Sequence, residues 1–373
     1  MRAACPAVLF AALLLAAPLL AAPFASQPSA RAACPEPETS AAGTSFTSAH
    51  AVSDDESSES DGEDAEDESV PQPDTTITVR PGTSLEIENF GGAINVKTWD
   101  KDALKIAADH SLRDRVMIVR TGSAIRLKVK SRRWVPASVR YRIVAPRWMK
   151  LELSGVNTDI DVQDSRAEVR AETVQGDISC KGSTGFVSLS SVQGAILAQD
   201  VRGRVEVSSV NEAVRLTNVI GPIFAESVNG GIEIEGAQSD SVEASTINGP
   251  VTYEGTVSDA GFYRFATHNG CIDVAMPEKS NATVSLSTFS GGIDSSFPVT
   301  LKKIRSKRFQ TTLGTGRARF ELESFQGTIF LRRPSEARQR CEDEEDDKSD
   351  KADKTEKHEK VHKSAKGDKE DKL

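Results

Sequence analysis

The chain has 373 residues, of which 27% are charged and 38% are hydrophobic, and its formal net charge is −9. The negative charge lies mostly outside the segment that can fold. Residues 53–69 contain ten acids and no base, whereas residues 74–334 contain 33 bases and 29 acids. This near neutrality argues against a nucleic-acid-binding protein, whose binding domain would be basic.

The N-terminus predicts an exported protein. An apolar run from Val8 to Leu20 is followed by Ala30-Arg31-Ala32, which offers a cleavage site with small residues. We therefore interpret residues 1–32 as a secretory signal peptide. The alternative, a membrane anchor, is disfavoured because a spanning helix needs about 20 apolar residues. After cleavage no transmembrane segment is expected.

Two further segments are too polar to form a core. Residues 33–73 form an acidic linker, and residues 336–373 form a charged tail in which Lys recurs at every third position from Lys348 to Lys372. A period of three does not keep one face of a helix, so we predict that both segments are disordered. The remaining residues, 74–335, suit one elongated domain.

The folding segment contains an internal repeat. The phrase Val174-Gln-Gly-Asp-Ile returns as Val192-Gln-Gly-Ala-Ile, and related phrases follow at Val210 and Val228, each 18 residues after the last. Each repeat divides into two halves of nine residues, with apolar residues at positions 1, 3 and 6 and often Gly at position 8. Alternation indicates a short strand, and Gly suits a corner because it tolerates positive φ.

This pattern predicts an all-β, single-stranded β-solenoid of about 18-residue coils, with two strands and two corners in each coil. We place positions 1, 3 and 6 in the core, and we expect the coils to stack in parallel about 4.8 Å apart. The expected coils begin at Leu151, Val169, Val187, Val205, Ile223, Val242, Tyr263 and Val284.

The two ends of the solenoid are expected to be covered. The nine-residue pattern also occurs from Leu85 to Trp99, but it is lost over residues 103–150, which contain longer alternating strands and a turn at Thr121-Gly-Ser123. We interpret this part as an antiparallel cap at the N-terminal end, because open sheet ends favour aggregation. Strands at Phe320–Leu322 and Ile329–Leu331 are expected to close the other end.

One position of the repeat carries a hydroxyl in each copy, and we place it on the outer face. Stacking would then create a ladder that could bind a glycan, peptidoglycan or another flat polymer, although a structural role is the alternative. The candidate ladder consists of Thr173, Ser191, Ser209, Ser227, Thr246, Thr267, Thr288 and Ser324. Two positions later an amide recurs, from Asn157 to Gln326, and stacked amides stabilise parallel strands by bonding to one another.

No catalytic or metal-binding pattern is present in the sequence. The five cysteines are far apart and form no C-x-x-C pair, so neither a zinc site nor a disulfide framework is indicated. Acids are scattered along the predicted outer faces, and the coils have no long insertions in which an active site could form. We therefore expect no enzyme, no metal and no cofactor.

The V-[NQ]-G-x-[IV] phrase, behind a signal peptide, resembles the bacterial putative-adhesin family of β-strand-repeat proteins, a domain of unknown function. The resemblance covers roughly Thr75 to Arg333. It implies a right-handed β-helix in the periplasm or at the cell surface. A lipid anchor at Cys34 is conceivable, but Arg31 stands where lipoprotein signals have a large aliphatic residue.

Three functions remain open at this point. The first is a non-enzymatic envelope protein that presents a repetitive face as an adhesin or scaffold. The second is a polysaccharide-processing enzyme, which a pair of acids within about 10 Å in a groove would favour. The third is an envelope-stress or regulatory protein that docks a protein partner, which an exposed apolar patch of several hundred Å² would favour.

Overall fold

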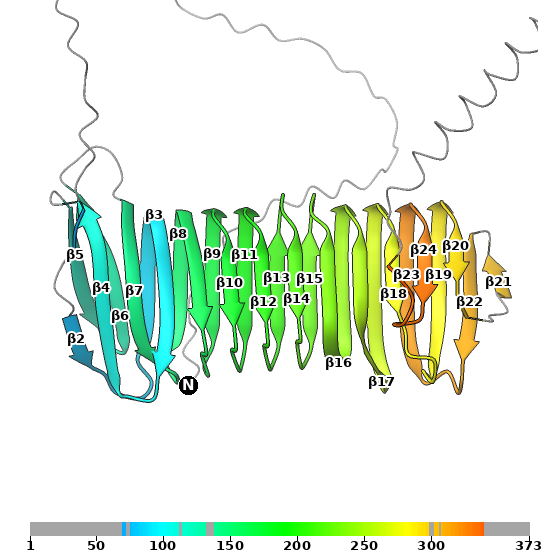
Figure 1. The fold of residues 1–373 in the computed structure, drawn as a ribbon, viewed down its shortest axis with the longest axis horizontal. Coiled ribbons are helices and arrows are strands. Elements are labelled where there is room, and N and C mark those ends of the chain that lie inside the picture. The colour runs from blue at the N-terminus through cyan, green and yellow to red at the C-terminus, as the bar shows by residue number, and fades with distance from the viewer. Residues whose placement is uncertain are drawn as a thin grey trace, which may run out of the picture. The chain divides into compact units, whose positions relative to one another are not determined.

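The computed structural model describes residues 69–71, 75–111, 114–131, 138–297, 302–305 and 307–338. The described residues belong to one compact unit. All their regular elements are strands, which hydrogen bonds join into one wound sheet (Figure 1). The predicted all-β solenoid is confirmed. The predicted signal peptide, Cys34, most of the acidic linker and most of the charged tail lie outside the described residues.

The strands of the described residues follow one another closely along the chain. In order they are β1 (Ser69–Pro71), β2 (Thr75–Thr78), β3 (Ser84–Trp99), β4 (Ala103–Ser111), β5 (Asp114–Thr121), β6 (Ala124–Ser131), β7 (Ser138–Pro146), β8 (Lys150–Gln163), β9 (Val169–Gln175), β10 (Ile178–Lys181), β11 (Val187–Gln193), β12 (Ile196–Gln199), β13 (Val205–Ser209), β14 (Val214–Thr217), β15 (Ile223–Ser227), β16 (Ile232–Asn248), β17 (Val251–Asn269), β18 (Ile272–Ala275), β19 (Ala282–Ser290), β20 (Ile293–Ser295), β21 (Lys302–Arg305), β22 (Arg308–Leu313), β23 (Ala318–Gln326) and β24 (Ile329–Arg332).

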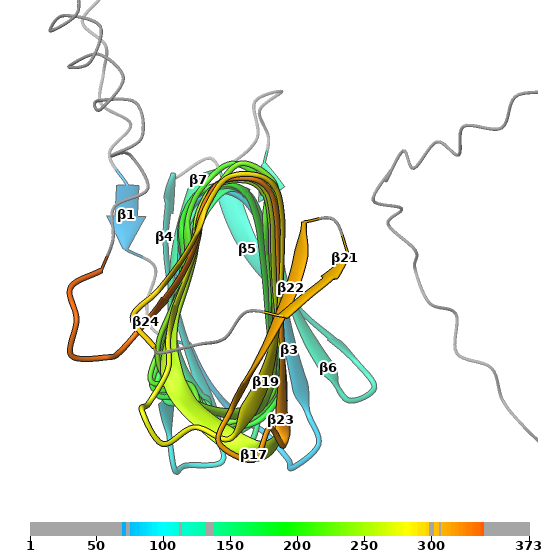
Figure 2. The ribbon, with the colours of Figure 1, turned by 90° about the vertical axis from the view of Figure 1, so that its right-hand side faces the viewer.

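The central coils repeat with the predicted step of 18 residues. Val187 in β11 pairs in parallel with Val169 on one side and Val205 on the other, and Ile196 in β12 pairs with Ile178 and Val214. Seen from the end, the coils superimpose as a flattened loop with a strand on each long side (Figure 2). The two corners of a coil therefore lie at opposite ends of this loop.

Glycine makes the first corner of most coils possible. Gly194 follows β11 with φ +151°, and a Cβ there would collide with the carbonyl group of Gly176 in the preceding coil. An L side chain is therefore excluded both by backbone conformation and by the close stacking of the corners. The recurrent Gly of the sequence repeat is explained by this packing.

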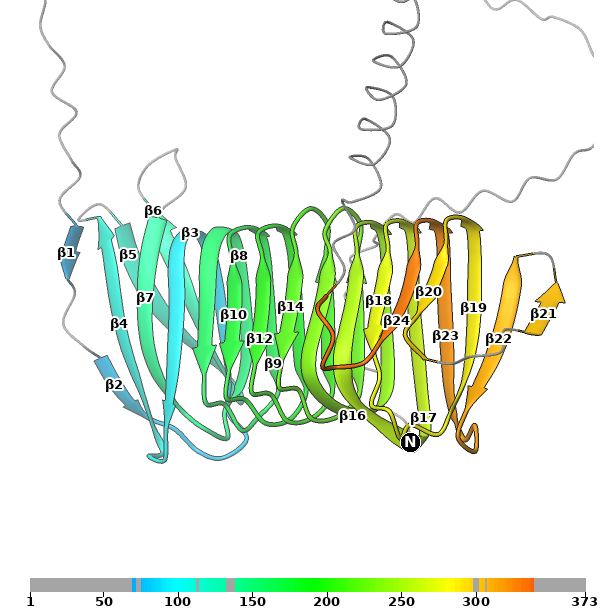
Figure 3. The same cartoon turned by 45° about the vertical axis from the view of Figure 1, so that its right-hand side comes forward.

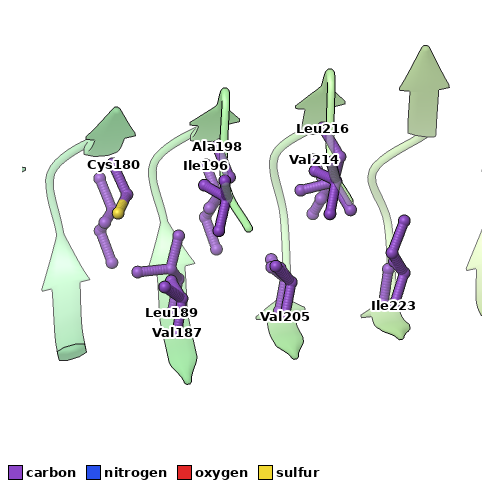
Figure 4. Packing of buried hydrophobic residues seen from close by; sticks show 14 of the residues in the cluster. Cys180, Val187, Leu189, Ile196, Ala198, Val205, Val214, Leu216 and Ile223 are labelled. Carbon is purple, nitrogen blue, oxygen red and sulfur yellow. The ribbon is translucent and has the colours of Figure 1, made fainter. Parts of the chain in front are cut away.

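The core consists of the first and third residues of each half-coil. Val187, Leu189, Ile196 and Ala198 are at most 1% exposed, and their side chains fill the space between the two long sides (Figure 4). The sixth residue of the second half-coil is also buried, as at Val201 and Val219. No single coil can bury its own apolar face, so the coils must stack. The stacked coils share one continuous core.

The sixth residue of the first half-coil is not in the core, and this prediction was wrong. Val174 and Val192 are 45% and 39% exposed, while the hydroxyl residues one position earlier are buried. The first strand continues its alternation to position 5, so position 6 points outward. In the second half-coil a residue with positive φ, such as Asp200 at +55°, turns the chain and lets Val201 point inward.

The N-terminal end is capped as predicted. β3 forms a coil beside β8, with Leu85 opposite Leu151 and Ile94 opposite Ile160. On its other side β3 pairs in parallel with β6 and β7, and the antiparallel strands β5 and β4 continue from these (Figure 1). Short strands β1 and β2 pair with β4. Ser69–Pro71 was expected to belong to the disordered linker but forms β1.

The C-terminal end is closed differently from the prediction. β23 pairs with β17 on one side and β19 on the other, and β24 lies between β18 and β20. The last coil in sequence is therefore inserted before the coil that begins at Val284 (Figure 3). The end is covered instead by β22, which pairs antiparallel with β19, and by β21 beyond it.

Two cysteines of the domain have different states. Cys180 in β10 is a free, buried thiol, and its burial raises its pKa to about 11. Cys271 is 4% exposed and is disulfide-bonded. The expectation that no disulfide is indicated was therefore incomplete, because separation along the chain does not determine separation in a stacked fold.

Candidate functional site

The predicted hydroxyl ladder exists as a column, but it is buried. Its members lie at equivalent positions of successive coils and are only 1–7% exposed: Thr173, Ser191, Ser209, Ser227, Thr246, Thr267, Thr288 and Ser324. The prediction that they form an outer face is wrong. They occupy position 5 of a strand whose inward positions are 1, 3 and 5.

These hydroxyls tie successive corners together. Thr246 Oγ1 donates to the carbonyl oxygen of Gly230 at 2.9 Å, and Thr267 Oγ1 donates in the same way to Gly249 at 2.9 Å. Ser227 Oγ accepts from the amide of Gly230 at 3.0 Å. Buried hydroxyls need such partners, and here the partners are corner groups that strand pairing leaves free. The column is therefore part of the framework.

The amide column does lie on the surface, and its groups bond mainly to one another. Gln175 Nε2 donates to Gln193 Oε1 at 2.7 Å, and Asn229 Nδ2 donates to Asn211 Oδ1 at 3.0 Å. Asn269 continues the series toward the C-terminal end. The expected ladder of mutually bonded amides is confirmed. These bonds between neighbouring coils give the amides a structural role in the stack.

An exposed apolar column, which we name the apolar ridge, runs beside the amides. Its members are 36–57% exposed: Phe90, Val156, Val174, Val192, Val228, Ile247, Phe289 and Phe325. At the C-terminal end the rings of His268, Phe325 and Phe289 stack with centroids 4.6 and 4.8 Å apart. Lys307 Nζ lies 3.6 Å from the centroid of Phe289. The ring faces are thus covered, and mainly ring edges face the solvent.

A groove at the opposite corner of the coils has free polar groups, and we name it the corner groove. Its volume is about 620 Å³. It lies between two columns of residues that follow the second strand of each coil. One column is Asp164, Gly182, Asp200, Asn218 and Gly236, and the other is Arg147, Arg166, Thr184, Arg202, Ile220 and Gln238.

Backbone pairing sets the spacing along the groove. Arg166 N donates to Arg147 O at 2.8 Å, and parallel bridges join Thr184 to Arg202, Arg202 to Ile220, and Ile220 to Gln238. The second column therefore rises by one strand spacing per coil. Five steps from Arg147 to Gln238 correspond to roughly 24 Å at ~4.8 Å each.

The first column turns the chain at the corner, and its side chains are small and polar for that reason. Asp164, Asp200 and Asn218 have φ of +58°, +55° and +54°. Asp and Asn are the side chains that tolerate this conformation best after Gly. Gly182 has no side chain to obstruct the Asp164 carboxylate, which lies where its Cβ would be. The sequence places acids and glycines here for backbone reasons, and the groove contains carboxylates as a result.

The second column has guanidinium groups without acidic partners. Arg166 and Arg202 are exposed and form no ion pair with any described residue, whereas Arg147 Nε lies 3.4 Å from Asp100 Oδ1. On the first column, Asp200 Oδ1 accepts a hydrogen bond from Asn218 Nδ2 at 3.0 Å. The groove thus offers guanidinium donors in one column and carboxylate acceptors in the other.

The two carboxylates of the corner groove are widely spaced. Asp164 and Asp200 are two coils apart, roughly 9.6 Å by strand spacing. Glycoside hydrolysis requires an acid and a second carboxylate that flank the scissile bond. In the described part of the chain no group of three or more His, Cys, Asp or Glu could hold a metal ion. The same residues include no helix able to cross a membrane.

Sequence reasoning missed the corner groove. The signal was available in the second half-coil, where position 5 is Asp, Gly or Asn and position 7 is Arg in two coils. We assigned the corner to the Gly at position 8 and did not ask which side chains would line the turn at position 5. The amide column was found because it repeats in nearly every coil, while the groove's charged residues do not.

Comparisons with known proteins give a family match and similar solved structures. A family model described as Toastrack DUF4097 matches residues 83–332. A putative cell adhesion protein from Clostridium sporogenes is 10% identical, with 71% of this chain and 100% of its own covered and a TM-score of 0.19. A putative adhesin from Bacteroides fragilis is 12% identical, with 71% and 97% covered and a TM-score of 0.28. No curated protein matches the sequence.

Proposed function

The chain belongs to the Toastrack DUF4097 family, and on that premise we propose that it is a non-enzymatic, exported bacterial envelope protein that binds an extended polysaccharide along the corner groove. It acts as an adhesin or scaffold rather than as a catalyst. The observation that carries this proposal is one hollow that runs along successive coils and is lined by exposed polar side chains, of which Arg166 and Arg202 form no ion pair with any described residue.

The chemistry of the groove suits sugar hydroxyls. A hydroxyl both donates and accepts hydrogen bonds, so it can bond to an Asp carboxylate on one wall and a guanidinium on the other. Asp164, Arg166, Asp200 and Arg202 are exposed, so only modest desolvation opposes binding. A linear polymer that lies lengthwise would repeat the same contacts from coil to coil. Affinity would then grow with the number of units bound.

The apolar ridge favours a second function, which is docking of an envelope protein. It exposes a column of mostly apolar residues that includes Val174, Val192 and Phe325. Such patches are typical of protein-binding surfaces. The two functions can be separated because ridge and groove lie at opposite corners. Substituting Val174 and Val192 by Ser should abolish capture of an envelope protein and leave polysaccharide binding intact.

Binding to immobilised bacterial polysaccharides and peptidoglycan tests the proposed function. The full chain should bind at least one polymer, and Thr184→Trp should weaken that binding because the indole fills the middle of the groove. We expect a loss of roughly tenfold or more, since several hydrogen bonds of ~0.5–1.5 kcal/mol each are blocked. Thr217→Trp places the same ring outside the groove and should have no effect.

Two outcomes would reject the proposal. Failure of the folded chain to bind any polymer would remove its basis, and equal binding by Thr184→Trp would place the binding site elsewhere. Release of new reducing ends from a bound polysaccharide, abolished by Asp164→Asn and Asp200→Asn, would favour the polysaccharide-processing enzyme instead.

A further inference from the structure

The two walls of the corner groove carry opposite charges in the same coils. Asp164 and Arg166 line the groove in one coil, and Asp200 and Arg202 line it two coils later. The coil between them contributes the uncharged residues Gly182 and Thr184. We name the two charged pairs rungs. They are separated by two strand spacings, roughly 9.6 Å.

The backbone holds the charges of a rung apart. Where the chain enters a strand, charged residues two apart do meet: Arg170 Nε lies 2.6 Å from Glu168, and Arg204 lies 2.6 Å from Glu206. Neither rung forms such a pair among the described residues. At the corner, the chain turns at Asp164 or Asp200 with positive φ, and a buried residue follows before the Arg.

Charges that are separated in this way can be neutralised by a ligand that carries both signs. We propose that the corner groove selects a zwitterionic polysaccharide, whose repeating unit has a cationic amine and a carboxylate. This inference rests on the proposed function and specifies its ligand class. The amine faces the Asp wall, and the carboxylate faces the Arg wall, whose planar guanidinium groups match a carboxylate with two parallel hydrogen bonds.

The opposed walls also exclude polymers of a single charge. A polyanion bound to Arg166 and Arg202 lies in the same groove as the carboxylates of Asp164 and Asp200, which repel it, and a polycation meets the reverse arrangement. Such repulsion gives specificity even where the attraction is modest. Because all four side chains are exposed, salt screens these interactions, and the preference should weaken as ionic strength rises.

Four polysaccharides that differ in their charged groups test this inference on the full chain. Carboxymethyl chitosan carries amine and carboxylate, chitosan carries amine, carboxymethyl dextran carries carboxylate, and dextran carries neither. We expect carboxymethyl chitosan to bind about tenfold more tightly than the others at low salt. Arg202→Gln and Asp200→Asn should each weaken its binding roughly two- to fivefold, the range expected for exposed charge pairs.

The two variants should also change the preference in opposite directions. Arg202→Gln should improve the relative affinity for chitosan, and Asp200→Asn should improve it for carboxymethyl dextran, which a merely structural role would not produce. Arg264→Gln removes an exposed guanidinium that lies 3.9 Å from Glu243, away from the groove, and serves as the control.

Equal affinity for the four polymers overturns the inference and leaves the proposed function standing. Tighter binding of chitosan or carboxymethyl dextran than of carboxymethyl chitosan also overturns it. Failure to bind any of the four overturns the inference, whereas the proposed function is rejected only if the chain also fails to bind the bacterial polysaccharides and peptidoglycan.

Discussion

At the scale of single residues, the hydroxyl column shows how a polar side chain can belong to a core. Each buried hydroxyl bonds to a backbone group at a corner, where the strand ladders end. An apolar residue of the same size would leave that carbonyl oxygen without a partner. The hydroxyl therefore recurs because the corner needs a donor, and not because a ligand needs a surface.

Thr246→Val should destabilise the protein by about 1–2 kcal/mol. The substitution keeps the shape of the side chain but removes the 2.9 Å bond to Gly230 O, which leaves a buried acceptor unsatisfied. Chemical denaturation measures the difference. Thr217→Val on the partly exposed side of β14 is the control and should stay within about 0.5 kcal/mol of the wild type. A variant at Thr246 as stable as the wild type would contradict the structural role.

Residue composition alone could not show that position 5 is buried and position 6 is exposed. Valine at position 6 suggested the interior, and serine at position 5 suggested the surface, yet Ser191 is 1% exposed and Val192 is 39% exposed. Strict alternation from Val187 would have given the correct assignment. The period of the strand is a stronger constraint than the polarity of one residue, and the hydrogen bond that makes Ser191 acceptable requires three-dimensional structure.

At the scale of the element, each coil has residues that point into the core and residues that lie on its surface at the corner. Val207→Asp should be severely destabilising, by more than about 4 kcal/mol, because Val207 is 2% exposed and no described group could pair with a new charge at the centre of β13. Val192→Asp should cost less than about 1 kcal/mol because it lies on the apolar ridge. Thermal or urea unfolding of the two variants compares them directly. Similar losses of stability in both would refute the assignment of Val207 to the core and Val192 to the surface.

The inserted C-terminal coil shows where sequence order fails as a guide to stacking. Tyr263 pairs with Phe320, and Phe320 pairs with Val284, so the coils do not stack in the order of the chain. Phe289 and Phe325 occupy equivalent positions but are 36 residues apart, twice the usual step of 18. This long step indicated an irregularity, because the hairpin β21–β22 occupies the interval. The strands with which β23 pairs depend on side-chain packing, which the sequence repeat alone does not predict.

The segment after the last strand contacts the outer face of β16. Arg338 pairs with Glu233 and with Glu235, the latter at 2.7 Å, and Arg215 also lies 2.7 Å from Glu233. Residues from 336 onward were predicted to be disordered, but this part of them is held by ion pairs. Partial burial alone would raise the pKa of Glu233, yet hydrogen bonds from Arg338 and Arg215 outweigh that effect and lower it.

This pKa shift predicts how stability depends on pH. Because the pKa of Glu233 is lower in the folded state than in the unfolded state, its contribution is present above its ordinary pKa of about 4.5 and is lost as pH falls through the lowered value. Glu233→Gln should therefore be less stable than the wild type at neutral pH, and the two stabilities should converge in acid. Urea unfolding across this range measures the effect. A constant difference at all pH values would contradict it.

At the scale of the whole molecule, stacking turns each repeated residue into a line along the solenoid. Three lines differ in what they can still bind. The amides bond to one another, the rings at the end of the apolar ridge cover one another, and the corner groove has unpaired charges. The sequence predicted the solenoid and the amide line, but it placed the residues of the apolar ridge in the core. The third depends on backbone turns at Asp164 and Asp200 whose positive φ no repeat pattern revealed.

The dependence of affinity on ligand length tests lengthwise binding in the corner groove most directly. A series of oligosaccharides of increasing length, cut from whichever polymer binds the full chain, should show affinity that rises with each added unit. The rise should end when the ligand spans the groove, at roughly 24 Å for five strand spacings. Affinity that is independent of length would indicate recognition of a chain end and would contradict the account.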